Sequence, residues 1–166
     1  MPTHTRLEVT PPPNTDEVVQ QAIEAHSREP GGLLPLLHAI QDGLGWLPPG
    51  CLPRVAAALN LSRAEVHGVV SFYHDFRTEP PGRRVVRICR AESCQAMGAE
   101  ALVDHACARL GMAMHSTRVD DAFTLEPVYC LGNCALSPSV TVDGTLYGKV
   151  TPARLDVLLD QPAESE

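Results

Sequence analysis

Four of the six cysteines in this 166-residue chain come as two closely spaced pairs, and these pairs constrain the fold more than any other feature. Cys89 and Cys94 form a C-x4-C pair, and Cys130 and Cys134 form a C-x3-C pair. Each pair follows a stretch whose pattern predicts a β-strand, so we expect both pairs on loops at strand ends. Such loops can bring four sulfurs around one small object. Thiolates are soft ligands that suit iron–sulfur clusters or zinc.

The spacing within the pairs narrows the kind of site without deciding it. Structural zinc sites often use C-x2-C, and thioredoxin-type redox chemistry uses C-x-x-C, but neither pair has that spacing. The loops also contain small residues and hydrogen-bond donors that can reach cluster sulfurs, namely Ser93, Gly132, Asn133 and Ala135. The residues alone therefore favour a [2Fe–2S] cluster, with zinc second and unrelated thiols third.

The two remaining cysteines are interpreted as structural. Cys107 falls on the apolar face of a predicted helix, between Val103 and Leu110, which indicates a buried small hydrophobic residue. Cys51 stands near a helix start and is interpreted as a partly buried thiol. The seven histidines form no H-x3–5-H pair and are not spaced for a Rieske centre, so we expect no histidine ligand.

The residue pattern in the first half of the chain predicts a tail followed by helices. Residues 1–14 are rich in Pro and Thr and predict a flexible tail. Residues 15–76 carry apolar residues at helical spacing, interrupted at Gly31-Gly32 and again at 43–50, which predicts four helices in a small bundle. The last of these helices begins at a capping-box pattern, Ser62-Arg-Ala-Glu65.

The pattern changes after a predicted linker at 77–82. Residues 83–160 alternate between strand and helix, as a small α+β domain does. Strands are predicted at 84–89 and 124–130, with an amphipathic helix between them that ends at Gly111. Asp143-Gly144 predicts a hairpin, and Thr151-Pro152 predicts the start of a last helix.

The composition excludes several classes of protein. A net charge of −7 argues against a nucleic-acid binder, and a hydrophobic content of 44% is enough for a packed core. The sequence contains no run of 18 apolar residues, so no membrane span is predicted. The first residues lack the pattern of a secretory signal, and we therefore expect a cytoplasmic protein. Disulfides are rare in the cytoplasm, so six cysteines there require a metal or redox explanation. The sequence contains neither a G-x-G-x-x-G motif nor a P-loop, so no nucleotide-binding site is predicted.

Three stretches are informative together: Glu65-Val-His-Gly-Val-Val-Ser-Phe-Tyr73, Cys89-Arg-Ala-Glu-Ser-Cys-Gln95, and Cys130-Leu-Gly-Asn-Cys-Ala-Leu-Ser-Pro138 with Thr124-Leu before it. They resemble the thioredoxin-like [2Fe–2S] ferredoxin family. This family includes the small peripheral-arm subunit of respiratory complex I and its relatives in NAD-linked hydrogenases and formate dehydrogenases. The resemblance covers about residues 20–160. It implies an α+β fold in which an N-terminal helical bundle precedes a thioredoxin-like [2Fe–2S] domain. One departure lies at Met114-His-Ser-Thr117, where many relatives carry a Gly-Glu-Thr-like stretch.

The resemblance also implies a set of ligands. The family's cluster ligands map onto Cys89, Cys94, Cys130 and Cys134, which would hold one [2Fe–2S] cluster. It implies no catalytic residue in this chain.

Within the family, the cysteine stretches and Ser71-Phe-Tyr-His-Asp-Phe-Arg77 are most similar to gamma subunits of soluble, molybdenum-containing NAD-dependent formate dehydrogenases. This implies a non-catalytic electron-transfer subunit beside a diaphorase partner that holds FMN and binds NAD. Further Fe–S clusters and a molybdenum cofactor would lie on partner subunits, including the large formate dehydrogenase subunit. The helical half has no chemical motif, and we expect it to dock to a partner.

Two other interpretations stay open. The equivalent subunit of complex I or of an NAD-linked hydrogenase would share the same fold and cluster. A zinc-stabilised adaptor without a redox role is the alternative from a different class.

Overall fold

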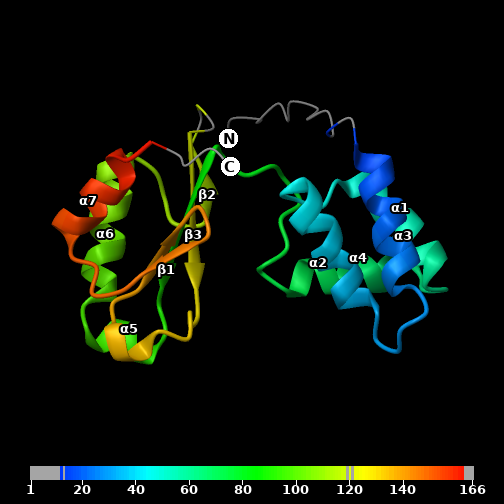
Figure 1. Cartoon of the computed structure of the whole chain (residues 1–166), viewed down its shortest axis with the longest axis horizontal. Helices are drawn as coiled ribbons and strands as arrows, with labels where there is room; N and C mark the ends of the chain where they lie inside the picture. Colours follow the sequence, from blue (N-terminus) through cyan, green and yellow to red (C-terminus); the bar gives the residue numbers. More distant parts are fainter. Residues whose placement is uncertain (1–11, 13, 119, 121, 163–166) are drawn as a thin grey trace, which may run out of the picture. The chain divides into compact units, whose positions relative to one another are not determined.

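The computed structural model describes residue 12, residues 14–118, residue 120 and residues 122–162. The chain divides between Pro80 and Pro81 into two compact units (Figure 1), and each has its own hydrophobic core. Most of the predicted tail, residues 1–14, lies outside the described residues. None of the described helices is long and apolar enough to cross a membrane.

The first unit is built from the helices that the sequence predicts. They are α1 (Thr15–His26), α2 (Leu33–Leu44), the 3-10 turn η1 (Pro49–Cys51), α3 (Leu52–Ala58) and α4 (Arg63–Phe72). The apolar face of α2 is the centre of the unit, because Leu36, Leu37 and Ile40 are fully buried there. Pro35 is accommodated because it lies in the first turn of α2, where no intrahelical N–H is required.

The buried side chain of Gln41 holds the segment that follows α4 against the helical unit. The side-chain amide of Gln41 donates to the carbonyl of Asp75 at 2.8 Å, and its oxygen accepts the N–H of Arg77 at 2.8 Å. Phe76, between these two residues, packs into the core. The segment up to Arg77 therefore belongs to the helical unit, and the connection between the units begins after it.

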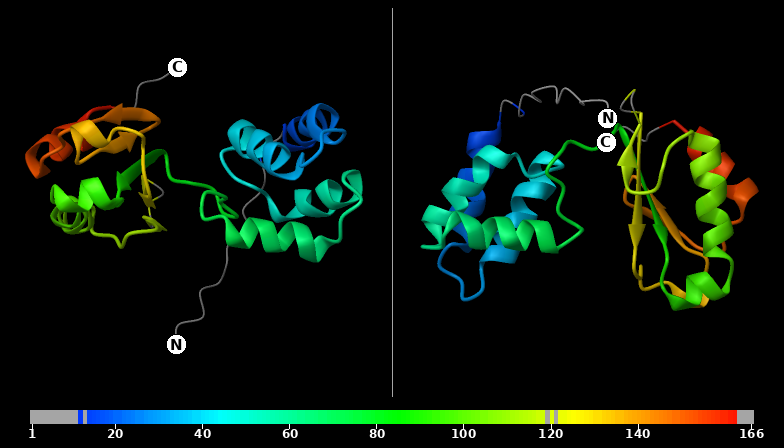
Figure 2. Two further views of the ribbon diagram at one scale, coloured as in Figure 1. Left: turned by 90° about the horizontal axis from the view of Figure 1, so that it is seen from below. Right: turned by 180° about the vertical axis from the view of Figure 1, so that it is seen from behind.

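The second unit is a five-stranded sheet with helices on one face. The strands are β1 (Arg84–Cys89), β2 (Ser116–Thr117), β3 (Phe123–Val128), β4 (Val140–Val142) and β5 (Thr145–Tyr147), in the order β2-β3-β1-β4-β5. Among the described strands, only β1 and β3 pair in parallel, and the other neighbours are antiparallel. Two helices, α6 (Ala99–Leu110) and α7 (Pro152–Asp160), lie on the same face of the sheet in Figures 1 and 2.

The core of this unit lies between the sheet and those helices. Val86, Ile88 and Leu125 point from the central strands into the core, where they meet Leu102 of α6 and Leu155 of α7. This alternation of buried and half-buried residues follows from the two-residue period of a strand.

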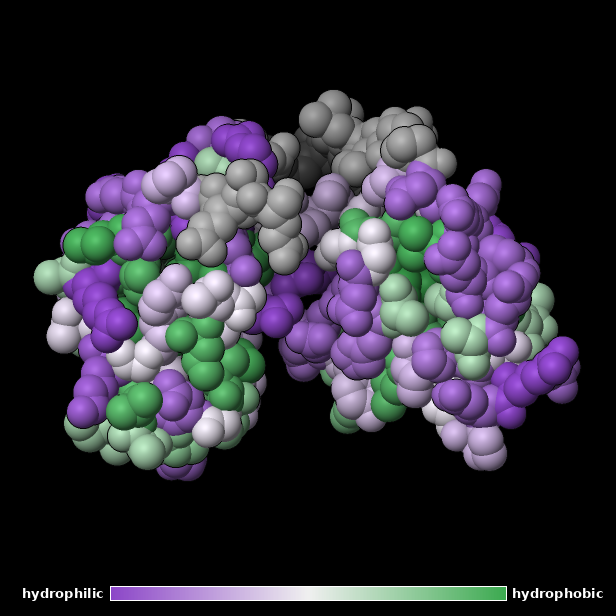
Figure 3. Space-filling view, viewed as in Figure 1, coloured by the Kyte–Doolittle hydropathy of each residue, from purple (hydrophilic) through white to green (hydrophobic). Residues whose placement is uncertain are grey.

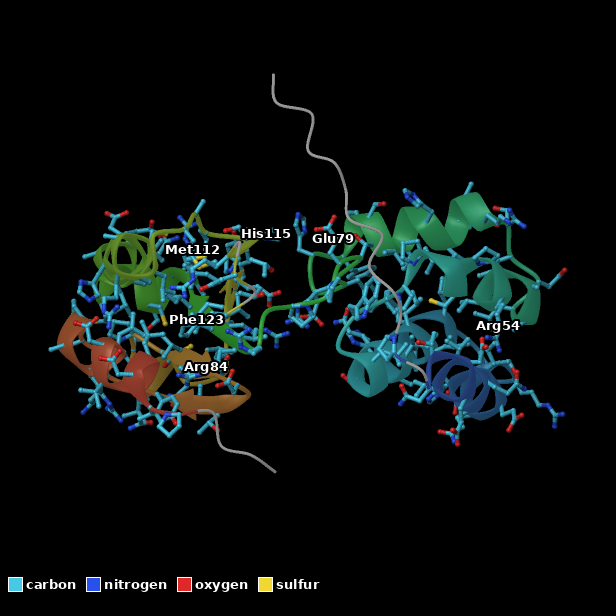
Figure 4. All side chains as sticks on the ribbon, turned by 90° about the horizontal axis from the view of Figure 1, so that it is seen from above. Arg54, Glu79, Arg84, Met112, His115 and Phe123 are labelled. Atoms are coloured by element: carbon cyan, nitrogen blue, oxygen red, sulfur yellow. The ribbon has the colours of Figure 1, made fainter. Side chains whose placement is uncertain are left out.

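Arg84 fixes α7 to the beginning of β1. Its guanidinium donates to the carbonyls of Leu159 and Gln161 at 2.8 and 2.6 Å, at the end of α7. The same group lies 5.6 Å from the centre of the Phe123 ring, and Figure 4 shows the two side chains from neighbouring strands. A cation at the negative end of a helix dipole stabilises that helix.

The sequence pattern predicts neither the short helix α5 (Glu92–Ala96) nor the strand β2, which has two residues, nor the 3-10 turn η2 (Cys134–Leu136). Ser116 and Thr117 of β2 pair with Leu125 and Thr124, so the stretch that departs from the family pattern is a sheet edge. The predicted hairpin at Asp143-Gly144 is present, and both residues have positive φ, as a tight hairpin turn requires.

Candidate functional site

The four paired cysteines meet at one end of the sheet because of its topology. β1 and β3 run parallel as neighbours, and Cys89 at the end of β1 is in register with Val128 at the end of β3. Cys130 follows two residues later, so the two carboxyl ends place it close to Cys89. The short helix α5 carries Cys94 and lies at this end of the sheet in Figure 1, and the 3-10 turn η2 (Cys134–Leu136) begins with Cys134.

The sulfurs come together as two pairs. The Sγ atoms of Cys130 and Cys134 are 3.9 Å apart, and the side chains of Cys89 and Cys94 interact directly. The charges of Cys94 and Cys89 also act on Cys134, so the two pairs are close neighbours. Within the described part of the chain, no three His, Cys, Asp or Glu side chains converge tightly enough to hold a single metal ion.

One pair is inside the protein and the other is at its surface. Cys89 and Cys94 are each 2% exposed and pack with Ala99 in a small apolar cluster of their own. Cys130 and Cys134 are exposed. A group held by all four sulfurs would therefore be anchored on its inner side and accessible on its outer side.

The inner thiols have opposite pKa shifts. Burial raises the pKa of Cys89, and the neighbouring Cys94 raises it further, although the N–H groups of Ala91 and Leu131 act against this. Burial also acts to raise the pKa of Cys94, but hydrogen bonds from the Ser137 hydroxyl, the Ser139 N–H and Cys89 outweigh it, so the pKa is lowered.

The outer pair shows the same crowding of charge. The hydrogen bond with Cys130 and then the charge of Cys130 raise the pKa of Cys134. Four thiolates at this end of the sheet repel one another, and a positively charged metal group between them would relieve the repulsion. The donor set is thus chemically suited to metal, and its two pairs match a cluster in which each of two irons takes two thiolates.

The backbone around the sulfurs is shaped to donate hydrogen bonds to them. Cys130 has a φ of 118° and Gly132 a φ of 71°, both in the left-handed region, and the N–H of Gly132 lies 3.3 Å from the Cys130 sulfur. Gly132 adopts this conformation without strain, but at the non-glycine residue Cys130 it is strained, and strained backbone concentrates at functional sites. With the N–H groups that reach Cys89 and Cys94, the site has the hydrogen bonds to sulfur that tune Fe–S clusters.

The structure refines the predicted positions of the ligands and donors. Cys94 lies on a helix and not on the expected loop, because the C-x4-C segment turns directly into α5. Of the expected donors, Gly132 reaches a sulfur through its N–H, while Ser93 bonds the carbonyl of Cys134 at 3.2 Å and the Ser137 hydroxyl at 2.9 Å. Asn133 donates its side-chain amide to the Ser139 hydroxyl at 3.2 Å.

Ser137 and Ser139 are functional residues that the sequence pattern does not predict. Ser137 Oγ lies 3.5 Å from the Cys94 sulfur, and the backbone N–H of Ser139 donates a hydrogen bond to the same sulfur. Their signal is the run Cys134-Ala-Leu-Ser-Pro-Ser139, in which two serines follow soon after a ligand. Which atom each serine would reach depends on how the loop folds over α5, and spacing does not give that.

The two unpaired cysteines differ from their interpretation in burial. Cys51 is 3% exposed in the core of the helical unit, more buried than expected, and this burial raises its pKa to about 11. Cys107 is only partly buried on α6, where it packs against the core of the second unit.

Comparison with known proteins supports this description of the fold. Residues 19–163 match the family model described as thioredoxin-like [2Fe-2S] ferredoxin. The chain is 35% identical over 124 residues to one subunit of the NADH-quinone oxidoreductase of Pseudomonas aeruginosa, covering 75% of each protein. It is 34% identical over 151 residues to NADP-reducing hydrogenase subunit HndA of Solidesulfovibrio fructosivorans, covering 91% of this chain and 88% of that one.

A solved structure is also similar. The NAD+-reducing [NiFe]-hydrogenase in its air-oxidised state superposes with a TM-score of 0.65 and 26% identity. The match covers 78% of this chain but only 22% of the hydrogenase chain, so the similarity concerns one part of a larger protein.

Proposed function

The chain belongs to the thioredoxin-like [2Fe–2S] ferredoxin family, and from that premise we propose that it is an electron-transfer subunit of an NAD-linked oxidoreductase. In this proposal Cys89, Cys94, Cys130 and Cys134 hold one [2Fe–2S] cluster. The observation that carries the proposal is the meeting of two cysteine pairs at the carboxyl ends of two parallel neighbouring strands. When bound, such a cluster takes up and releases one electron at a time.

The residues of the chain have separate tasks in this role. The buried pair, Cys89 and Cys94, anchors the site in the protein, and backbone N–H groups around it stabilise negative charge on sulfur. The exposed pair, Cys130 and Cys134, forms the edge through which electrons pass to and from a partner. No proton is transferred by these groups, and the chain needs no catalytic residue of its own.

The surface around the exposed pair suits a protein partner. Tyr129 is 70% exposed, Met97 61% and Leu136 44%, although all three side chains are apolar or aromatic. Figure 3 shows apolar surface at the end of the second unit where α5 lies. Exposed apolar patches of this kind mark interaction sites. We assign this face to the flavin-containing partner.

The helical unit has its own exposed apolar stripe, which supports a docking role. Phe72 is 72% exposed and Tyr73 44% exposed at the end of α4. They border a groove of about 550 Å³ whose wall also includes Leu33, Leu61 and Val69. In the proposal, this groove and stripe bind a subunit of the same complex, while the second unit carries the cluster.

The finer proposal concerns the parent complex. The resemblance of 71–77 and of the two cysteine stretches supports the gamma subunit of a soluble, molybdenum-containing NAD-dependent formate dehydrogenase. There the partner would hold FMN and reduce NAD+, and a large molybdenum subunit with further Fe–S clusters would oxidise formate to CO2. The second candidate is the equivalent subunit of an NADH-quinone oxidoreductase or a hydrogenase, which the names of the similar proteins favour.

Purification of the chain in its native complex separates these candidates. A tag on the chain should recover a complex that reduces NAD+ with formate and contains molybdenum and FMN. NAD+ or NADP+ reduction with H2, or NADH oxidation by a quinone, would instead assign the chain to the second candidate.

The ligand assignment is tested by serine substitutions. Each of Cys89→Ser, Cys94→Ser, Cys130→Ser and Cys134→Ser should abolish or alter the visible absorbance and the EPR signal of the reduced chain, because each removes one thiolate ligand. Cys107→Ser is the matched control, since Cys107 is a partly buried cysteine of the same unit. An unchanged spectrum in any of the four ligand variants would contradict the assignment.

A further inference from the structure

Ser137 connects the inner and outer cysteine pairs. Its side chain is 8% exposed, and its hydroxyl lies 3.5 Å from the sulfur of Cys94 and 2.9 Å from the carbonyl oxygen of Cys134. The same hydroxyl lies 2.9 Å from the hydroxyl of Ser93, which in turn lies 3.2 Å from the Cys134 carbonyl. Two hydroxyls therefore face two acceptors.

The number of available protons decides which hydrogen bonds the two hydroxyls, the Cys94 sulfur and the Cys134 carbonyl can form. Each hydroxyl has one proton to donate. A free Cys94 thiol can donate to Ser137, which then donates to the Cys134 carbonyl. A Cys94 thiolate that binds iron has no proton and can only accept. Ser93 can then supply the carbonyl, which leaves the proton of Ser137 for the Cys94 sulfur.

We propose that Ser137 donates a hydrogen bond to the Cys94 sulfur of the bound cluster and raises its reduction potential, and that Ser93 enables this by bonding the Cys134 carbonyl. The inference rests on the proposed function, since it requires the cluster on the four cysteines. It goes further by naming side chains that set the potential, beyond the ligands themselves. Both serines are positioning residues, because they act through Cys94.

The direction of the effect follows from charge. Reduction adds one electron and neither forms nor breaks a bond, so the ligand sulfurs become more negative. A hydroxyl that donates to one of them stabilises the reduced state more than the oxidised state. A net hydrogen bond of this kind is worth on the order of a tenfold change in an equilibrium constant. For a one-electron couple, a tenfold change corresponds to about 59 mV.

The experiment is a redox titration of the whole chain with its cluster reconstituted from iron and sulfide. The midpoint potential is measured by EPR with dithionite as the reductant. Ser137→Ala should lower the equilibrium constant for reduction about tenfold. Ser137→Thr keeps the hydroxyl and should restore most of the potential.

Ser93→Ala gives an independent test, because its hydroxyl bonds oxygen atoms of Cys134 and Ser137. Without the Ser93 hydroxyl, Ser137 must donate its proton to the Cys134 carbonyl and no longer to the Cys94 sulfur. The potential should therefore fall although the Ser137 hydroxyl is still present. The double variant Ser93→Ala/Ser137→Ala should match Ser137→Ala alone, since both changes remove the same hydrogen bond. Ser116→Ala is the control: its hydroxyl donates to the carbonyl of Ala113, and the potential should not change.

The outcomes separate this inference from the proposed function. A wild-type chain without two iron and two sulfide would contradict the proposed function itself. A wild-type cluster whose potential is unchanged in Ser137→Ala, or lowered equally in Ser137→Thr, would overturn the role of Ser137 alone. If Ser137→Ala does not retain iron, the potential of Ser93→Ala decides, and an unchanged value there overturns the inference.

Discussion

Gly148 lies against the loop that carries Cys134 and leaves no room for a side chain. A Cβ atom added to it would lie 2.6 Å from the Cβ of Leu136 and 2.8 Å from the amide nitrogen of Asn133. Both contacts belong to the segment that positions Cys134. Gly148→Ala should therefore displace this segment, lower the free energy of unfolding by about 1–3 kcal/mol and reduce the iron bound per chain. Urea unfolding and iron analysis measure the two effects.

Gly50→Ala is the control for this substitution. Apart from its chain neighbours, no described atom lies within 4 Å of a Cβ added to Gly50, so stability should not fall and iron content should remain as in the wild type. If Gly148→Ala behaved like Gly50→Ala, close packing against the Cys134 loop would not be what holds this ligand.

At the scale of single elements, the start of α4 gives a test that depends on pH. Ser62 Oγ accepts the N–H of Glu65 at 3.2 Å, and the Glu65 carboxylate accepts the N–H of Ser62 at 2.8 Å. The backbone N–H of Ser62 and then its hydroxyl, each 2.8 Å from the carboxylate, donate to Glu65 and lower its pKa below the ordinary value of 4.5. The stabilisation is fully present above pH 4.5 and is lost as the pH falls through the lower pKa of the folded state.

Glu65→Gln should therefore lower the melting temperature at pH 7 and have progressively less effect below pH 4.5. Thermal unfolding followed by circular dichroism across this range measures the difference. In a Ser62→Ala background the effect of Glu65→Gln should be smaller but not absent, because this background removes the hydroxyl that donates to the carboxylate and keeps the backbone N–H of residue 62. A Glu65→Gln effect that grows with acidity would contradict the capping box as its cause.

The same scale shows which parts of the fold the sequence could predict. Helices of three turns, such as α2 and α6, have enough apolar residues at helical spacing to be recognised, and their ends have capping signals at Gly45 and Gly111. The five residues of α5 are too few to show a period, so the sequence pattern predicts a loop at Cys94. β2 has two residues and is defined only by its pairing with β3.

The candidate site could be predicted for its ligands but not for its surroundings. Two cysteine pairs after two strands are visible in the sequence, and parallel pairing of β1 and β3 brings them together. The donors Ser137 and Ser139 reach Cys94 from a loop more than 40 residues further along the chain. Such contacts depend on tertiary packing, which local patterns do not contain.

At the scale of the whole molecule, the two units divide the proposed work, and the docking role of the helical unit can be tested separately. Phe72→Ser removes an exposed aromatic side chain without opening the core, so the chain should fold and keep its cluster. It should nevertheless lose its partner, because the apolar stripe on α4 is interrupted. Co-purification with a tagged chain measures partner binding, and iron analysis of the same preparation measures whether the cluster is retained.

Val157→Ser is the matched control for Phe72→Ser, because Val157 is also an apolar residue, 59% exposed, but lies on α7 of the second unit. It should leave the complex intact. Complete recovery of the complex with Phe72→Ser would show that the partner does not bind this stripe. Deletion of residues 1–76 extends the test, since the remaining unit should keep the cluster and leave the complex.

The central claim is that the four paired cysteines hold a two-iron cluster, and metal analysis of the purified chain combined with EPR after one-electron reduction tests it most directly. The account predicts two iron and two acid-labile sulfide per chain, with a rhombic signal from the reduced state. A colourless chain with one zinc and no sulfide would contradict it, and would identify the chain as a zinc-stabilised adaptor.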